Sequence, residues 1–179
     1  TASFVENAAV TNVVHDASTG ASDVDGDTLT YSISGTDAGS FDVDSASGEI
    51  TFKASPNYET KNSYSLSLTA TDGSGATATQ ALTVTVTDAN DSPVFSAATS
   101  TGTVAENVAT STQIFDANAT DEDTGDTLTY TVTGTDFSVV DIDASTGVVT
   151  LKSSANFEAK TSYSFNVVAS DGTSSATQA

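Results

Sequence analysis

Acidic residues recur in four short motifs, which appear in the same order in both halves of the chain. The motifs are Glu-Asn (6–7 and 106–107), Ala-x-Asp-x-Asp (21–25 and 119–123), Asn-aromatic-Glu (57–59 and 156–158) and Ala-x-Asp-Gly (70–73 and 169–172). A fifth acidic motif, Asp-Ala-Asn-Asp-Ser-Pro, occurs once, at 88–93. Carboxylate and amide oxygens are ligands for hard cations, whereas zinc would favour the His and Cys side chains that this chain almost lacks. The chemistry that the motifs favour is therefore the binding of a multivalent cation.

The net charge of the chain points to the same class of ligand. Asp and Glu number 24 against 4 Lys and Arg, so the formal net charge is −20. Such a surface repels nucleic acid and anionic membranes, because both carry dense negative charge. It favours multivalent cations, which neutralise crowded carboxylates. A plainer interpretation is that the acidity only keeps a secreted protein soluble.

The composition of the sequence also disfavours several other functions. Without cysteine there is no disulfide, no thiolate metal site and no thiol nucleophile. No apolar run approaches the ~18 residues of a membrane span, so we expect no membrane insertion. No nucleophile–base pair stands out, so we predict that the chain is not an enzyme. Because the chain has no Met, we expect it to be a segment of a longer protein.

Two copies of one fold must position the acidic motifs. The pentapeptide Asp-Thr-Leu-Thr-Tyr at 27–31 returns at 126–130, a shift of 99 residues. A period of this length indicates tandem domains and not one larger fold. We predict a first domain at 1–91 and a second at 92–179, with the 88–93 motif at their joint.

Apolar residues alternate with Ser and Thr in both copies, as in Leu82, Val84 and Val86, and this pattern predicts strands with one buried face. In the first copy we predict strands near 3–6, 10–15, 29–34, 41–43, 49–52, 63–71 and 77–86. Seven strands in so short a copy favour an immunoglobulin-like Greek-key β-sandwich. We therefore predict an all-β chain of two tandem sandwiches. The second copy stops at the counterpart of Ala81, so we expect it to lack its last strand.

In their order and spacing, the five motifs resemble those of cadherin repeats, and the resemblance covers essentially the whole chain. The bias toward Ser, Thr, Asp and Gly is similar to that of cadherin-like tandem domains in large bacterial surface adhesins. The resemblance implies a secreted or cell-surface protein that holds calcium between successive repeats.

The resemblance also implies which residues bind calcium. At the joint these are Glu6, Asn57, Glu59, Asp88, Ala89, Asn90, Asp91, Ser92, Asp121, Asp123 and Asp171. Asp23, Asp25 and Asp72 would form a half-site toward a preceding repeat, and Glu106, Asn156 and Glu158 a half-site toward a following joint. Asn57 stands where the family has Asp, which removes one charge and lowers the affinity or the number of ions. We interpret Tyr58 and Phe157 as packing residues that orient the neighbouring glutamate.

The expected function is mechanical. Without calcium, carboxylates of two domains would repel across a short hinge, and with calcium they would share cations and stiffen an extender module. Two alternatives stay open: a calcium-dependent polysaccharide-binding module, which would need an exposed aromatic strip, and a homophilic adhesion domain, whose vertebrate form would use an N-terminal Trp. The expected partners are calcium, neighbouring repeats, and a polysaccharide or another cell-surface protein.

Overall fold

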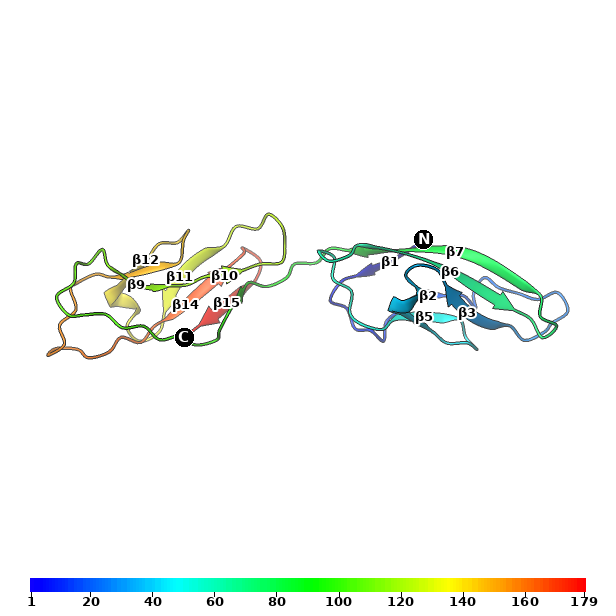
Figure 1. The fold of residues 1–179 in the computed structure, drawn as a ribbon, viewed down its shortest axis with the longest axis horizontal. Helices are drawn as coiled ribbons and strands as arrows, with labels where there is room; N and C mark the ends of the chain where they lie inside the picture. The colour runs from blue at the N-terminus through cyan, green and yellow to red at the C-terminus, as the bar shows by residue number, and fades with distance from the viewer. The chain divides into compact units, whose positions relative to one another are not determined.

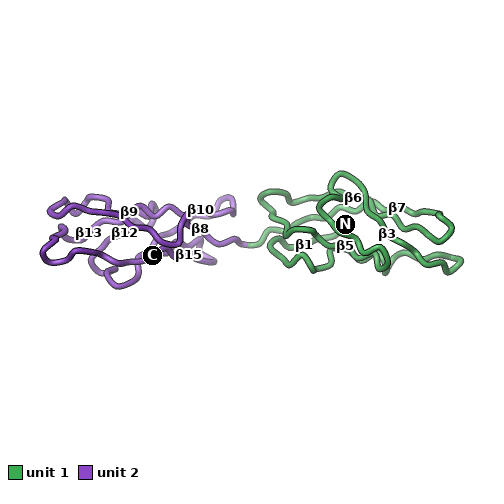
Figure 2. The backbone as a smooth tube through the Cα atoms, turned by 60° about the horizontal axis from the view of Figure 1, so that its bottom comes forward, with its two compact units in different colours: residues 1–89 green, residues 90–179 purple.

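The computed structural model describes residues 1–179 as two compact units, Thr1–Ala89 (unit 1) and Asn90–Ala179 (unit 2), drawn in two colours in Figure 2. Both units consist of β-strands joined by turns, with a single turn of 3-10 helix in each (η1, Ala38–Ser40; η2, Phe137–Val139) (Figure 1). None of the helical segments has the length and apolarity that a membrane-spanning helix needs.

Unit 1 is a sandwich of two sheets. Its strands are β1 (Ala2–Val5), β2 (Val13–Asp16), β3 (Thr30–Ser34), β4 (Phe41–Val43), β5 (Glu49–Phe52), β6 (Ser63–Thr71) and β7 (Thr77–Thr87). One sheet has the order β1-β7-β6-β3 and the other β2-β5-β4. All seven predicted strands are present. The second begins at Val13 and not at Val10, because the N–H of Asn12 donates to the carbonyl of Ala9 and closes a turn there.

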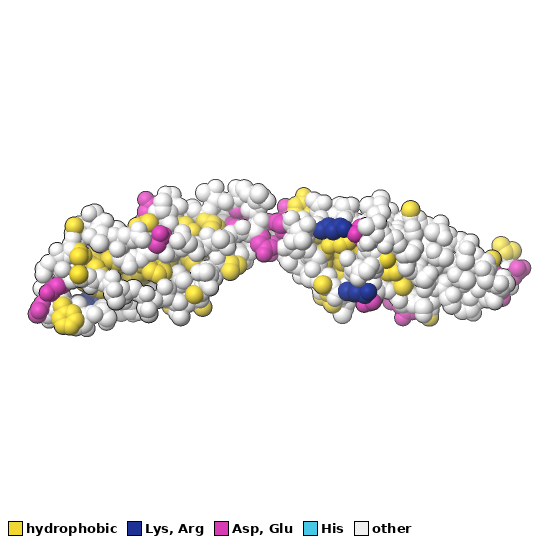
Figure 3. All heavy atoms as spheres, in the orientation of Figure 1, with side chains coloured by type: hydrophobic (Ala, Val, Ile, Leu, Met, Phe, Trp, Pro, Cys, Tyr) yellow, Lys and Arg dark blue, Asp and Glu magenta, His cyan; other side chains and the backbone are white.

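The alternating residues of unit 1 build its core. Leu82, Val84 and Val86 of β7 are all buried, whereas the threonines between them are exposed. Phe41, Phe52 and other aromatic residues form a cluster at the centre, with these two ring centroids 4.4 Å apart. The outer faces are covered by Ser and Thr, so most of the surface in Figure 3 is white, with scattered carboxylates and few lysines.

Unit 2 repeats this architecture with smaller sheets. Its strands are β8 (Val94–Phe95), β9 (Gln113–Asp116), β10 (Ala119–Thr120), β11 (Thr129–Thr133), β12 (Val140–Ile142), β13 (Val148–Leu151), β14 (Asn166–Ser170) and β15 (Ser175–Gln178). The sheet orders are β11-β14-β15, β12-β13-β9 and β10-β8. The predicted fold class, two tandem β-sandwiches, is confirmed.

The two units differ where unit 1 closes its larger sheet. In unit 1 the second half of β7 lies between β1 and β6 and pairs with both. In unit 2 the corresponding strand β15 stops at Gln178, and no strand takes the place of residues 82–87. One edge of the β11-β14-β15 sheet is therefore shorter than in unit 1. The prediction that the second copy lacks its last strand is correct only in part, because β15 forms the counterpart of the first part of β7.

Candidate metal centre

Glu6 organises the acidic end of unit 1. It follows β1, and the next residue, Asn7, turns the chain with a φ of 57°, a left-handed conformation that Asn tolerates better than most residues. The Glu6 side chain is only 2% exposed. Its Oε2 accepts the backbone N–H of Tyr58 at 2.6 Å, and its Oε1 accepts that of Ala89 at 2.8 Å. One carboxylate thus links the start of the unit, the Asn-aromatic-Glu loop and the residues after β7.

Two further carboxylates lie close to it. An oxygen of Glu59 lies within 4.8 Å of a carboxylate oxygen of Glu6, and also within 4.8 Å of one of Asp88. Asn57, predicted as a ligand, accepts the N–H of Thr60 at 2.6 Å through its side-chain oxygen. Like charges at such distances repel each other unless protons or cations compensate. Unit 1 therefore gathers Glu6, Glu59 and Asp88, its carboxylates predicted for the joint, at one end.

Unit 2 has its own cluster before β11. Carboxylate oxygens of Asp121, Asp123 and Asp126 lie within 4.8 Å of one another. The N–H of Asp123 donates to Oδ1 of Asp121 at 3.0 Å, and the N–H of Asp91 donates to Oδ2 of Asp123 at 2.7 Å. Oδ2 of Asp121 is buried and accepts no hydrogen bond. A buried carboxylate oxygen without a donor is costly, and a cation is a suitable partner for it.

The sequence prediction missed Asp126. Desolvation by the surrounding protein raises the pKa of Asp126, although the residue is exposed, and the neighbouring charges of Asp123, Asp121 and Asp171 raise it further. The available signal was the repeated pentapeptide Asp-Thr-Leu-Thr-Tyr, whose Asp recurs at 27 and 126 together with the apolar residues. By itself the pentapeptide indicates only the period of the repeat.

Asp171 and Asn90 complete the acidic end of unit 2. Asp171 accepts the backbone N–H groups of Ser174 and Thr173, each at 2.6 Å, and the Ser174 hydroxyl at 2.7 Å. The N–H and hydroxyl of Ser174 in particular hold the pKa of Asp171 far below its usual range. The Asn90 amide donates to Asp171 at 3.0 Å and also to the backbone carbonyl of Asp91. Ser92, also predicted as a ligand, is exposed.

The predicted N-terminal half-site lies in loops of unit 1. Oδ1 of Asp23 accepts the N–H groups of Asp25 at 2.8 Å and Asp27 at 3.2 Å. Asp72 accepts those of Ser74 at 2.9 Å and Ala76 at 2.7 Å. These carboxylates hold their own turns, and hydrogen bonding, led by the Ser74 hydroxyl, lowers the pKa of Asp72.

The predicted C-terminal half-site is the most open of the acidic sets. Glu106, Asn156 and Glu158 are all exposed. Glu106 accepts a single backbone hydrogen bond, from Phe157 at 3.3 Å. The prediction that Phe157 packs is wrong, because its side chain is 64% exposed, whereas Tyr58 packs against the core of unit 1.

Three comparisons place the chain among known proteins. Residues 1–87 and 100–179 match the family described as Cadherin domain. The chain is 35% identical to human protocadherin Fat 4 over 147 residues, and 31% identical to rat cadherin-23 over 155 residues. These alignments cover 79% and 83% of the chain, but only 3% and 5% of those much longer relatives.

Solved structures agree on the fold. A mouse cadherin-23 fragment, EC22-24, superposes with a TM-score of 0.62 at 24% identity, covering 98% of this chain and 59% of that one. Drosophila N-cadherin EC1-4 superposes with a TM-score of 0.65 at 25% identity, covering 99% of this chain and 45% of that one. Matched by the family over both sandwiches, the chain belongs to the cadherin family, as a pair of tandem cadherin domains.

Proposed function

We propose that this pair of domains is a calcium-binding extender module of a large adhesion protein, stiffened when calcium binds at the joint between its two units. As cadherin domains, the two units belong to an extracellular or cell-surface protein, in agreement with the localisation predicted from the sequence. The observation that carries the calcium proposal is the buried Oδ2 of Asp121, which accepts no hydrogen bond and lies in a cluster of three carboxylates.

The donor atoms fit a hard cation. Both acidic ends offer only oxygen, and calcium takes 6–8 oxygen ligands, including bidentate carboxylates and backbone carbonyls. The proposed ligands from unit 1 are Glu6, Asn57, Glu59, Asp88 and Ala89, and those from unit 2 are Asn90, Asp91, Ser92, Asp121, Asp123, Asp126 and Asp171. The bound cations would offset the repulsion within each cluster and couple the two units.

Calcium binding of this kind responds to the extracellular concentration. Extracellular calcium modules bind with Kd values of about 10⁻⁴–10⁻³ M. A ligand that binds only the folded state adds about 2.7 kcal/mol of stability at 100 times its Kd. The module would therefore be stiff in millimolar calcium and flexible where calcium is scarce.

Asp121→Asn tests the metal site with an effect that changes sign. In chelator the substitution removes one of three crowded negative charges, so we expect the melting temperature of unit 2 to stay constant or rise. In saturating calcium the same substitution removes a ligand, so the melting temperature should fall below that of the wild type. A purely structural Asp121 would lower the melting temperature in both buffers, and that result would contradict the proposal.

Small-angle scattering tests the extender function. We expect a narrow distribution of maximum dimensions in millimolar calcium and a broad distribution in chelator. Asp91→Ala should give the broad distribution even with calcium, because it removes a proposed ligand from the residues that join the units. Asp42→Ala is a matched control, since Asp42 lies on β4 and pairs with Lys53 at 3.7 Å. Identical scattering profiles with and without calcium would contradict the proposed extender function.

The alternatives have less support. A polysaccharide-binding face would need a strip of exposed aromatic rings, but only Phe137 and Phe157 are strongly exposed among the aromatic residues, at 53% and 64%. Glycan binding at fixed calcium would discriminate this alternative. Homophilic adhesion by an N-terminal Trp anchor has no candidate residue, because the chain contains no Trp.

A further inference from the structure

One ion pair in each unit lies next to the Asn-aromatic-Glu motif. Each unit has two lysines, and one of them follows the glutamate of this motif by two residues. In unit 1 this lysine is Lys61, whose ammonium lies 2.5 Å from Oδ1 of Asp37, a side chain that is only 14% exposed. The other lysine, Lys53, lies 3.7 Å from Asp42, which is 69% exposed. The first pair is therefore the closer and the more enclosed of the two.

Asp37 is itself fixed to strand β6. Its Oδ2 accepts the N–H of Ser65 at 2.8 Å, and its own N–H donates to the carbonyl of Ser65 at 3.2 Å. The hydrogen bond from Lys61, followed by that from Ser65, lowers the pKa of Asp37, so this carboxylate is charged at neutral pH. The Lys61 ammonium also lies over the ring of Tyr64, 4.8 Å from its centroid, where the ring attracts a cation. Two partners therefore hold this lysine.

Lys61 is the last residue of the turn 57–61, which carries Glu59. Its backbone N–H donates to the carbonyl of the first residue of the turn at 3.0 Å. The start of the turn is fixed because the N–H of Tyr58 donates to the buried carboxylate of Glu6. The end is fixed by the Lys61 side chain, and the carbonyl of the next residue accepts an N–H from β7 at 2.9 Å. Glu59 thus lies between two anchored ends.

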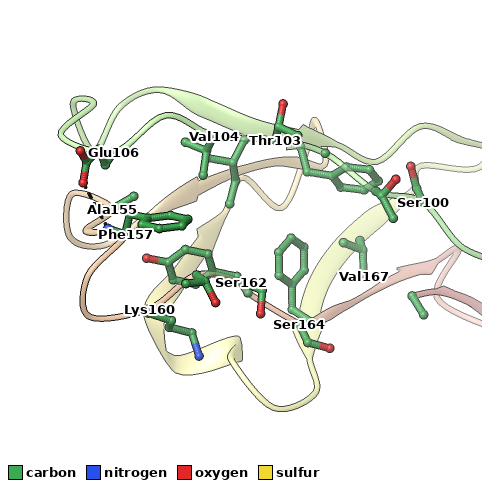
Figure 4. A pocket seen from close by; sticks show the side chains of 18 of the residues that line it. Ser100, Thr103, Val104, Glu106, Ala155, Phe157, Lys160, Ser162, Ser164 and Val167 are labelled. Atoms are coloured by element: carbon green, nitrogen blue, oxygen red, sulfur yellow. Dashed lines mark hydrogen bonds between the residues drawn. The ribbon is translucent and has the colours of Figure 1, made fainter.

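Unit 2 repeats the arrangement. The ammonium of Lys160 lies 2.9 Å from Asp136, which accepts the N–H of Ser164 at 2.7 Å. The N–H of Lys160 donates to the carbonyl of Asn156 at 2.9 Å and closes the equivalent turn. Figure 4 shows the pocket of unit 2 that Lys160 lines, and there its side chain points away from Glu106. The lysine is thus paired with the same aspartate in both units, whether the nearby glutamate is buried or exposed.

We propose that Lys61, held by Asp37, is a positioning residue for calcium, because it keeps the turn 57–61 in the conformation that places Glu59 beside Glu6. The inference rests on the proposed calcium function, since it concerns the same ligands. A ligand that is ordered before the cation arrives loses less conformational entropy on binding, so the affinity is higher. The pairing with Asp37 also keeps the ammonium from neutralising the carboxylates that calcium would bind.

Lys61→Met in the full chain tests the proposal by the direction of its effect. The Glu59 amide is followed by NMR during a calcium titration, and we expect the Kd to rise about threefold to tenfold. Loss of a positive charge from a chain with a net charge of −20 would by itself attract calcium more strongly and lower the Kd. A higher Kd therefore separates the loss of positioning from the change in charge.

Two variants serve as controls. Lys61→Arg should keep a Kd close to that of the wild type, because a guanidinium can pair with Asp37 and lie over the Tyr64 ring. Lys53→Met removes the same charge from the same unit but breaks only the looser pair with Asp42, so its Kd should stay equal or fall.

A second measurement needs no calcium. In chelator, Lys61→Met should speed hydrogen exchange at the amides of Thr60 and residue 61, which both donate within the turn, by roughly threefold or more. The melting temperature should change little, because Lys61 is exposed.

The possible outcomes separate this inference from the function on which it rests. An equal or lower Kd for Lys61→Met, or unchanged exchange in chelator, overturns the positioning role. A similar rise in Kd for Lys61→Arg overturns it as well, because the pair with Asp37 would then be irrelevant. A wild type that binds no calcium at all would instead overturn the proposed calcium function, and the positioning role with it.

Discussion

Glu6 and Glu106 occupy the same place in the same motif, yet their surroundings differ. Glu6 is buried and accepts two backbone hydrogen bonds, from the residues of two different loops. Glu106 is exposed and accepts one, at 3.3 Å. The difference arises because the residues after β7 close over Glu6, whereas the given residues stop at Ala179, before the counterparts of those residues. The burial of Glu6 thus depends on residues far from it in the sequence, which contribute one of its two backbone hydrogen bonds.

The cores of the two units differ in the same region. Phe4, Phe41, Phe52 and Tyr64 form a connected aromatic cluster in unit 1. In unit 2 only Phe115 and Phe165 lie close to each other, with ring centroids 6.3 Å apart. Aromatic pairs contribute about 0.5–1.5 kcal/mol beyond the area that they bury. Unit 1 is therefore expected to be the more stable of the two.

The largest expected effect comes from the aromatic cluster. Phe52→Ala should destabilise unit 1 by about 3–5 kcal/mol, because Phe52 is 3% exposed and touches the other rings of the cluster. Leu151→Ala, the matched change in unit 2, should cost about 2–3 kcal/mol, since a smaller side chain is removed. In calorimetry, each substitution should lower the temperature of only one of the two unfolding transitions. Equal losses of unfolding free energy in both units would contradict the expectation that unit 1 has the more stable core.

The two glutamates provide a smaller effect with a direct contrast. Glu6→Gln should cost about 1–3 kcal/mol in chelator, because Gln has one acceptor oxygen for two buried N–H groups. Glu106→Gln should change stability by less than about 0.5 kcal/mol, as is usual at exposed positions. Urea unfolding of both variants measures the two values. Losses of similar size would mean that the closing residues do not set the environment of this glutamate.

The smallest expected effect concerns a hairpin turn that the two units share. Asp143 and Asp44 hold equivalent hairpin turns by accepting backbone N–H groups at 2.8–2.9 Å. Hydrogen bonds, first from the Ser145 hydroxyl, lower the pKa of Asp143 from 3.8 to about 2. Because the folded pKa lies below the unfolded one, this stabilisation is complete above about pH 4 and is lost as the pH falls through 2.

Asp143→Ala should therefore lower the melting temperature of unit 2 at neutral pH, and this difference from the wild type should vanish toward pH 2. Asp44→Ala should act in the same direction on unit 1, since hydrogen bonding from the N–H of Ser47 also lowers the pKa of Asp44. Thermal melts at a series of pH values measure both. A difference that persists unchanged at pH 2 would show that the turn does not depend on the charged carboxylate.

Much of the fold was predictable from the sequence, because its signals are local. Alternation at period two places a residue such as Val84 on the buried face of a strand wherever that strand pairs. The cadherin family and the extracellular location are confirmed by the comparisons. The domain boundary after residue 91 and the calcium ligands stay predictions. Asp126 was missed because its role depends on the distance to Asp121 and Asp123, which its place in a repeated pentapeptide does not reveal.

The order of the strands, the turns and the list of acidic residues were thus encoded in short stretches of the chain. Only the tertiary structure decided which of those acids are buried and what each one contacts. Glu6 and Asp121 are the clearest cases. Glu6 is enclosed by residues 52 and 83 positions away along the chain, and Asp121 keeps one buried oxygen without a donor. The physical reason is that burial and hydrogen bonding depend on which distant segments pack over a residue, and a short motif does not encode that.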